Sequence, residues 1–145
     1  MAITNYRQQL RDAVHDLLVA YKAANAGQLA HVYNHPPQNP RVPCAYVTTE
    51  IPEPSITFDA QLRLRQLVVG VVVLLRATNA KEFSEAKDVL AEGLIDYFTV
   101  NNRQLPEAQM VPDSLDDPVE ESFGDATYVG FRLNIRGSIQ QGRAI

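Results

Sequence analysis

A long β-type run from Phe58 to Arg76 constrains the fold more than any other stretch of the sequence. Its first part, up to Arg65, alternates apolar and polar residues, as in a strand with one dry face and one wet face. Its second part, Leu67–Leu75, is apolar on both faces, as in a strand buried from two sides. Fully extended, the run would span about 60 Å, far more than an ordinary strand of about 5–6 residues. We therefore predict that it bends near Gln66 into two strands, or that it projects from the domain as an arm.

The composition is that of one soluble globular domain. The chain has 145 residues, of which 46% are hydrophobic and 21% charged, and this is enough to bury a core. The net charge of −4 argues against a dedicated nucleic-acid-binding protein, which would have a strongly basic face. The N-terminus lacks the features of a signal peptide, and the longest apolar run is too short for a transmembrane helix. With a single cysteine, Cys44, we expect a cytosolic protein without membrane contact.

Helical spacing of apolar residues predicts a first helix from about Asn5 to Asn25. A second helix is predicted from Asn79, a cap residue followed three positions later by Glu82, to the region 98–101. Strands are predicted at 29–33, at 44–49, in the mid-chain run, and in a closing hairpin over 119–136. The proline-containing segment 105–117 is predicted as a loop with a short strand at 109–111.

These elements predict an α+β fold. We expect a mixed, mostly antiparallel sheet of four to six strands, with two amphipathic helices on one face and a long projecting β-hairpin or arm. Residues 1–136 form the single domain, and residues 137–145 form a flexible tail. Two helices can cover only one face of the sheet, so the other face of the Leu67–Leu75 strand needs a second layer from this chain or from a neighbouring subunit. We expect the second of these, because burying that face favours association of copies.

No residue pattern predicts catalysis, a cofactor or a metal site. In an extended segment His31 and His35 lie about 13 Å apart, whereas zinc needs donors about 2 Å from one point. Cys44 has no surrounding motif and is expected to be a small buried residue in a strand. The acidic run Asp113–Asp125 does not match a calcium loop, so a solvated acidic face is preferred to a weak divalent site. We expect no enzyme activity, because no convergent set of acid, base and nucleophile can be named.

Five features in sequence form a pattern that resembles a known family. They are an amphipathic helix, a proline-flanked strand, a valine-rich strand, a capped helix and a closing strand: Tyr6–Tyr21, Pro43–Val47, the run ending Leu74-Leu75-Arg76, Asn79–Phe83 and Tyr128–Ile135. In this order the chain resembles the tail terminator proteins of long-tailed bacteriophages, of the lambda-like minor tail protein U type.

The resemblance implies a structural protein without catalytic residues, cofactor or metal. It implies a homo-oligomeric ring, a hexamer, which caps the tail tube, stops its polymerisation and provides the surface for head–tail joining. The implied partners are further copies of the chain, the tail tube protein and the head-completion (stopper or neck) protein. The implied location is the head-proximal end of the virion tail, after assembly in the host cytoplasm. DNA passes through such a ring as non-specifically contacted cargo, and a net acidic chain suits that lumen.

Two sets of residues are assigned under this interpretation. Residues at subunit or tube contacts are Phe58, Leu62, Arg63, Arg65, Val69, Val71 and Arg132. Acidic residues facing the lumen are Asp113, Asp116, Asp117, Glu120 and Glu121.

Three alternatives stay open at this point. One is a head–tail connector or neck protein from the same region of the virion. Another is a cytosolic, dimeric ligand-binding or regulatory α+β domain, and the third is a small enzyme. A hexameric mass favours the terminator, a stable dimer favours the regulatory domain, and a bound small molecule favours the enzyme.

Overall fold

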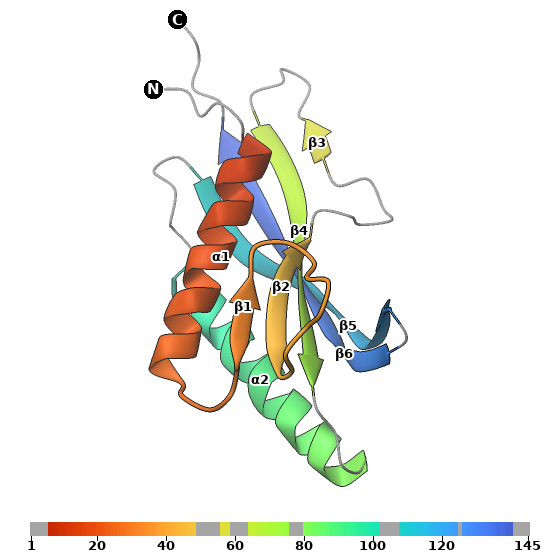
Figure 1. The fold of residues 1–145 in the computed structure, drawn as a ribbon. Coiled ribbons are helices and arrows are strands. Elements are labelled where there is room, and N and C mark those ends of the chain that lie inside the picture. The colour runs from red at the N-terminus through yellow and green to blue at the C-terminus, as the bar shows by residue number, and fades with distance from the viewer. Residues whose placement is uncertain are drawn as a thin grey trace, which may run out of the picture.

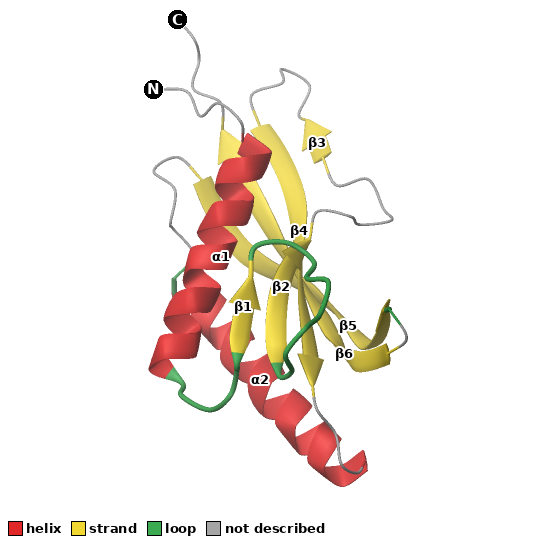
Figure 2. Ribbon diagram, viewed as in Figure 1, coloured by secondary structure: helices red, strands yellow, loops and turns green. Residues whose placement is uncertain are grey.

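A computed structural model of the chain describes residues 6–48, 56–58, 64–75, 80–101, 108–124 and 126–140. These residues form two helices and six strands, arranged as Figures 1 and 2 show. Their bounds are α1 Tyr6–Ala24, β1 His31–Tyr33, β2 Cys44–Thr48, β3 Ile56–Phe58, β4 Leu64–Leu75, α2 Ala80–Val100, β5 Ala108–Phe123 and β6 Ala126–Gln140. The predicted α+β class, with two helices and a mostly antiparallel sheet, is confirmed. Neither described helix is long and apolar enough to cross a membrane.

Strand β4 is the centre of the sheet. The strand order is β1-β2-β4-β6-β5, and β3 pairs with the start of β4 on the β2 side. The β1–β2 pair is parallel, and the other pairs are antiparallel. β4 pairs with β6 along its full length, from Leu64↔Gln140 to Leu75↔Val129. Its central place explains why the sequence of β4 is apolar on both faces.

The odd-numbered side chains of β4 from Val69 to Leu75 face the helices. Val69 and Val71 are fully buried, and they belong to one core with Leu10 and Leu18 of α1 and Leu94 of α2. Both helices therefore pack on this face of the sheet. The assignment of Val69 and Val71 to subunit contacts is wrong, because the helices of the same chain already cover these side chains.

The other face of β4 carries a second buried cluster. Val72 and Leu74 pack with Cys44 and Tyr46 of β2, and all four are at most 3% exposed. Four partly buried side chains cover this cluster: Tyr33, Val42, Phe123 and Tyr128. We had expected a neighbouring subunit to shield this face. That expectation is wrong for Val72 and Leu74, because the loop after β1 and the end of the β5–β6 hairpin, which bends at the lower right of Figure 1, seal them inside the chain.

A close approach between β6 and β4 lies where the hairpin leaves β4. A Cβ added at Gly130 would lie 1.6 Å from the carbonyl oxygen of Val73 and 3.0 Å from Cα of Leu74. Only glycine permits this approach, because backbone atoms cannot move aside as a flexible side chain can. Beyond this point the hairpin carries Phe123 and Tyr128 onto Tyr46, with ring centroids 6.1 Å apart for Tyr46–Phe123 and 5.9 Å for Phe123–Tyr128.

Strand β5 corrects the prediction of a loop for residues 108–117, whereas residues 105–107 lie outside the described residues. It runs from Ala108 to Phe123 through Pro112 and Pro118. β5 is an edge strand of the sheet, and an edge strand tolerates proline because one side of its backbone needs no ladder partner. The register shifts between Pro112 and Ser114 and between Asp116 and Val119, so bulges absorb the irregularity.

Two further boundaries differ from the prediction. β6 continues to Gln140, so residues 137–140 belong to the sheet and not to a tail, whereas residues 141–145 lie outside the described residues. Gln66, where the bend was predicted, lies inside β4 and pairs with Thr57 of the separate, antiparallel strand β3. Leu62 and Arg63 lie outside the described residues, and the prediction that this stretch projects as an arm is untested.

Candidate assembly surface

A hydrogen-bonded polar cluster joins β5 to β6 on the face of the sheet away from the helices. Arg132 donates from Nε and Nη2 to one carboxylate oxygen of Asp116, at 3.1 and 2.7 Å. Asn134, which is 7% exposed, donates to the same oxygen at 3.2 Å and to the Ser114 hydroxyl at 2.9 Å. These bonds connect the irregular part of β5 to the regular strand β6.

The electrostatics of this cluster favour the ionised form of Asp116. The hydrogen bond from Arg132, and next the one from Asn134, lower the pKa of Asp116 below its ordinary value of 3.8. The stem of Arg132 lies across Gly70, where an added Cβ would be 3.0 Å from Arg132 Cδ and 3.1 Å from Thr48 Cγ2. Arg132, assigned above to a subunit contact, is therefore engaged by its own chain.

Of the five acidic residues that were assigned to a lumen, some form ion pairs within the chain and others do not. Besides Asp116, Asp113 pairs with Arg136 at 3.4 Å and Asp117 pairs with Lys87 of α2 at 2.9 Å. Three of the five carboxylates are thus neutralised. Glu120 is exposed and Glu121 is half-buried, and neither makes an ion pair with another described residue.

Two of the assigned contact residues meet at one end of β4. Phe58, the last residue of β3, pairs with Arg65 near the start of β4. Figure 1 shows this end at the top of the molecule, whereas α2 begins beyond the opposite end of β4. The side chains of Phe58 and Arg65 lie outside what the structure describes, so only their backbone positions are fixed.

The remaining candidate residues take ordinary structural roles. His31 stacks on Tyr33 with ring centroids 5.7 Å apart, and its Nε2 lies 3.5 Å from Nη1 of Arg41. Cys44 is fully buried in β2, as predicted, and burial raises the pKa of its thiol to about 11. Among the described residues no group of three or more His, Cys, Asp or Glu side chains converges as metal ligands would.

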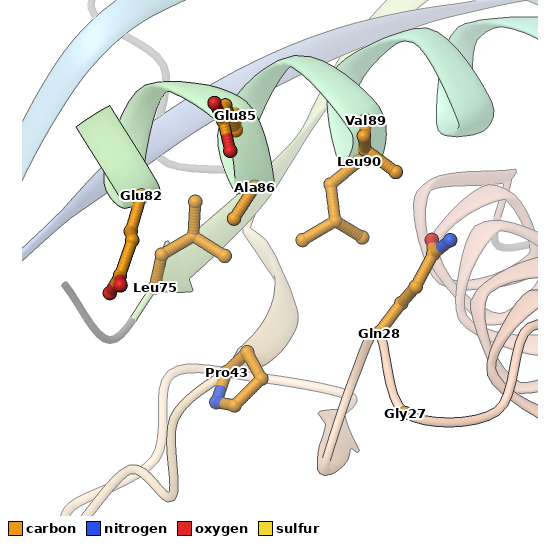
Figure 3. A pocket seen from close by; sticks show the side chains of 9 residues that line it. All are labelled: Gly27, Gln28, Pro43, Leu75, Glu82, Glu85, Ala86, Val89 and Leu90. Carbon is orange, nitrogen blue, oxygen red and sulfur yellow. The ribbon is translucent and has the colours of Figure 1, made fainter. Parts of the chain in front are cut away.

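A cavity of about 410 Å³ opens between the turn after α1 and the first half of α2. Figure 3 shows the residues that line it: Gly27, Gln28, Pro43, Leu75, Glu82, Glu85, Ala86, Val89 and Leu90. Leu75 and Leu90 give the cavity an apolar wall, and the carboxylates of Glu82 and Glu85 stand on the exposed side of α2. The cavity therefore joins an apolar interior to a negatively charged mouth.

The chain builds this cavity from a helix stop and a close helix crossing. Asn25 bonds back to the Tyr21 carbonyl through its backbone at 2.9 Å and its side chain at 3.1 Å, and Gly27 then turns the chain with a φ of 89°. The Tyr21 hydroxyl donates to Oε1 of Gln28 at 2.5 Å. The same hydroxyl lies 2.3 Å from where a Cβ at Gly93 would be, so Gly93 allows α1 and α2 to approach.

Sequence reasoning missed the cavity. Its lining residues come from four separate stretches of the chain, and no local pattern marks them as neighbours. The sequence predicted that the first helix ends near Asn25, but it did not predict the contact between Tyr21 and Gly93.

No protein-family model matches this chain, and a search of curated protein sequences finds no match. A function for this chain therefore has to be inferred from the pattern of its elements and the geometry of its surface.

Proposed function

We propose that this chain is a tail terminator of a long-tailed bacteriophage. It forms a ring of six copies that caps the tail tube, stops tube polymerisation and provides the surface for head–tail joining. The observation that carries the proposal is the order of the elements. The helix α1, the proline-flanked β2, the long valine-rich β4, the helix α2 and the closing β6 follow one another as in the family that the sequence resembles.

The contacts between copies in this ring lie at the ends and edges of the sheet. Both faces of β4 from Val69 to Leu75 are covered by the chain itself and have no free surface to offer. The end that carries Phe58 and Arg65 remains, as does the end that carries the cavity. A contact between two different ends is heterologous, and heterologous contacts generate rings when the rotation closes.

The lumen in this proposal is lined by part of the acidic strand. Glu120 and Glu121 are the members of the assigned set that the chain does not neutralise with a described basic residue. Carboxylates without a basic partner repel DNA phosphates, so the DNA can pass through the lumen without binding to its wall. The proposed protein acts as a structural part of the virion, at the head-proximal end of the tail, and is not an enzyme. Its partners are its own copies, the tail tube protein and the stopper protein.

The direct test adds the purified chain to tail tube protein under conditions of tube assembly, followed by negative-stain electron microscopy. We expect tubes with a density ring at one end and a narrowed length distribution. Tubes assembled without the chain, and with an unrelated protein of similar charge, serve as controls. Unchanged tube length and bare tube ends would overturn the proposal. Binding to head portals in place of tubes would identify a neck protein instead.

The cavity favours a second candidate, a dimeric ligand-binding or regulatory domain. Its volume of about 410 Å³ lies within the range of small-molecule sites. Native mass spectrometry separates the two functions. A stable dimer that carries a co-purified small molecule supports the ligand-binding domain, and a ligand-free hexamer supports the terminator.

A further inference from the structure

We propose that the cavity between α2 and the turn after α1 receives an arginine side chain from the Phe58–Arg65 segment of a second copy. The inference rests on the proposed ring and names the contact that closes it. The occupant is a basic side chain of a second copy of this chain, supplied by the neighbouring subunit.

The chemistry of the cavity fits a cation on an apolar stem. Leu75, Leu90 and Pro43 offer apolar surface to the methylene groups, and Glu82 and Glu85 stand where the charged head would emerge. Arginine has this character, because its stem packs on apolar surface while the guanidinium keeps polar partners. Its planar fork also suits carboxylates better than the compact ammonium of lysine.

The net electrostatic preference of the mouth is for a cation. The first turn of α2 contributes a partial positive charge of about half a unit, which disfavours a cation there. Glu82 lies in that first turn and offsets this charge, and Glu85 adds a second carboxylate one turn further on. The preference of the mouth for a cation therefore depends on Glu85, which is exposed and lines the cavity.

Distance excludes Arg65 of the same chain as the occupant. Arg65 and the cavity residue Leu75 lie ten positions apart on one continuous strand, and at about 3.3 Å per residue this is roughly 33 Å. Figure 1 shows β3 and the start of β4 at one end of the molecule and the start of α2 beyond the other. A donor end and an acceptor end on opposite sides of one subunit produce a head-to-tail contact, which closes into a ring or continues as a filament.

The test uses matched charge reversals on α2 of the full chain. Glu85→Lys places a positive charge at the cavity mouth, and Glu92→Lys makes the same change at an exposed position of α2 outside the cavity lining. Sedimentation velocity over a concentration series should show about tenfold or more weaker self-association for Glu85→Lys and an unchanged value for Glu92→Lys. The arm variant Arg63→Glu/Arg65→Glu should weaken association similarly. Combining it with Glu85→Lys should restore most of the loss.

A peptide covering residues 57–66 provides a second measurement that does not depend on ring closure. Fluorescence anisotropy with the labelled peptide should show salt-sensitive binding to the wild-type chain and to Glu92→Lys, and loss of binding to Glu85→Lys. Circular dichroism melts establish that each variant is folded. If Glu85→Lys is unstable, Glu85→Gln takes its place and should weaken binding by a smaller factor.

The outcomes for this contact and for the proposed function are separable. A ring that caps tail tubes but ignores Glu85→Lys and the arm variant overturns this contact and leaves the terminator standing. Peptide binding at the cavity, together with tubes that elongate unchecked, supports the contact and removes the terminator function. A wild-type chain that stays monomeric and does not bind the peptide overturns the contact.

Discussion

The substitution Gly130→Ala tests how the chain seals the second face of β4. The added Cβ would lie 1.6 Å from the Val73 carbonyl oxygen, whereas ordinary contact begins near 3.4 Å. The strands must therefore separate by about 2 Å at this point, which is too far for their hydrogen bonds to survive. The affected pairs, Leu74↔Gly130 and its neighbours, are those that hold the end of the β5–β6 hairpin over Val72 and Leu74.

The expected loss follows from three contributions. About two backbone hydrogen bonds at ~1 kcal/mol each are broken. Partial exposure of Val72 and Leu74 adds roughly 1–3 kcal/mol at about 25 cal/mol per Å². Alanine also restricts the unfolded chain, which stabilises the protein by about 0.5–1 kcal/mol and offsets little of the loss. We expect Gly130→Ala to lower the free energy of unfolding by about 2–4.5 kcal/mol, a large part of the ~5–15 kcal/mol typical of a domain.

Urea denaturation followed by circular dichroism and tyrosine fluorescence measures this change, since the chain has no tryptophan. Gly70→Ala is the matched control, because its Cβ would meet side-chain atoms of Arg132 and Thr48, at 3.0 and 3.1 Å, and no backbone atom among its nearest neighbours. The control should lose about 1 kcal/mol or less. A Gly130→Ala variant within 1 kcal/mol of the wild type, with an unchanged m value, would refute the close approach of β6 to β4.

Three further predictions follow from the packing and the titrating groups. Gly93→Ala should lower Tm, because its Cβ would lie 2.3 Å from the Tyr21 hydroxyl. Helix propensity alone favours alanine by about 1 kcal/mol, so a higher Tm would contradict the close crossing of α1 and α2. The lowered pKa of Asp116 stabilises the folded chain above pH 3.8, and this stabilisation is lost as the pH falls through the folded-state pKa. Asp116→Asn should therefore make the urea midpoint less dependent on pH in acid, and identical acid profiles for the variant and the wild type would contradict this. Cys44, fully buried with its thiol pKa raised to about 11, should react with a thiol reagent only upon unfolding, and rapid labelling of the native chain at neutral pH would disprove its burial.

The helices and the central strand could be predicted from local signals. Apolar spacing placed the C-terminal end of α1 within one residue of its observed end at Ala24, whereas the predicted start at Asn5 lies outside the described residues. The apolar run Leu67–Leu75 indicated burial on both faces, and β4 is indeed the middle of the sheet. These features depend on residues near one another in the chain, and sequence patterns report such features well.

The edge strand and the sealed face could not be predicted in the same way. Pro112 and Pro118 are loop signals in any local window, and only the edge position of β5 makes them tolerable. Gly130 looks ordinary in the sequence, and its importance comes from Val73, which is remote along the chain. The prediction of an uncovered valine face failed for this reason, because the cover comes from Phe123 and Tyr128 beyond that close approach.

On the candidate surface, too, local patterns could be predicted from the sequence, whereas contacts between remote residues could not. The alternation of Arg132, Asn134 and Arg136 on one face of the last strand was readable, but their pairing with Asp116, Ser114 and Asp113 depends on the register and bulges of β5. Lys87 meets Asp117 only because α2 packs beside β5. Density of charge along the sequence therefore overstated the free negative charge on the surface.

The central claim is that copies of this chain meet end to end and close into a ring. Native mass spectrometry of the purified chain, with the Arg63→Glu/Arg65→Glu variant beside it, tests this claim most directly. We predict a homohexamer for the wild type and a monomer for the variant, both of them folded. A wild-type chain that remains a monomer or a two-fold dimer at every concentration would contradict the claim.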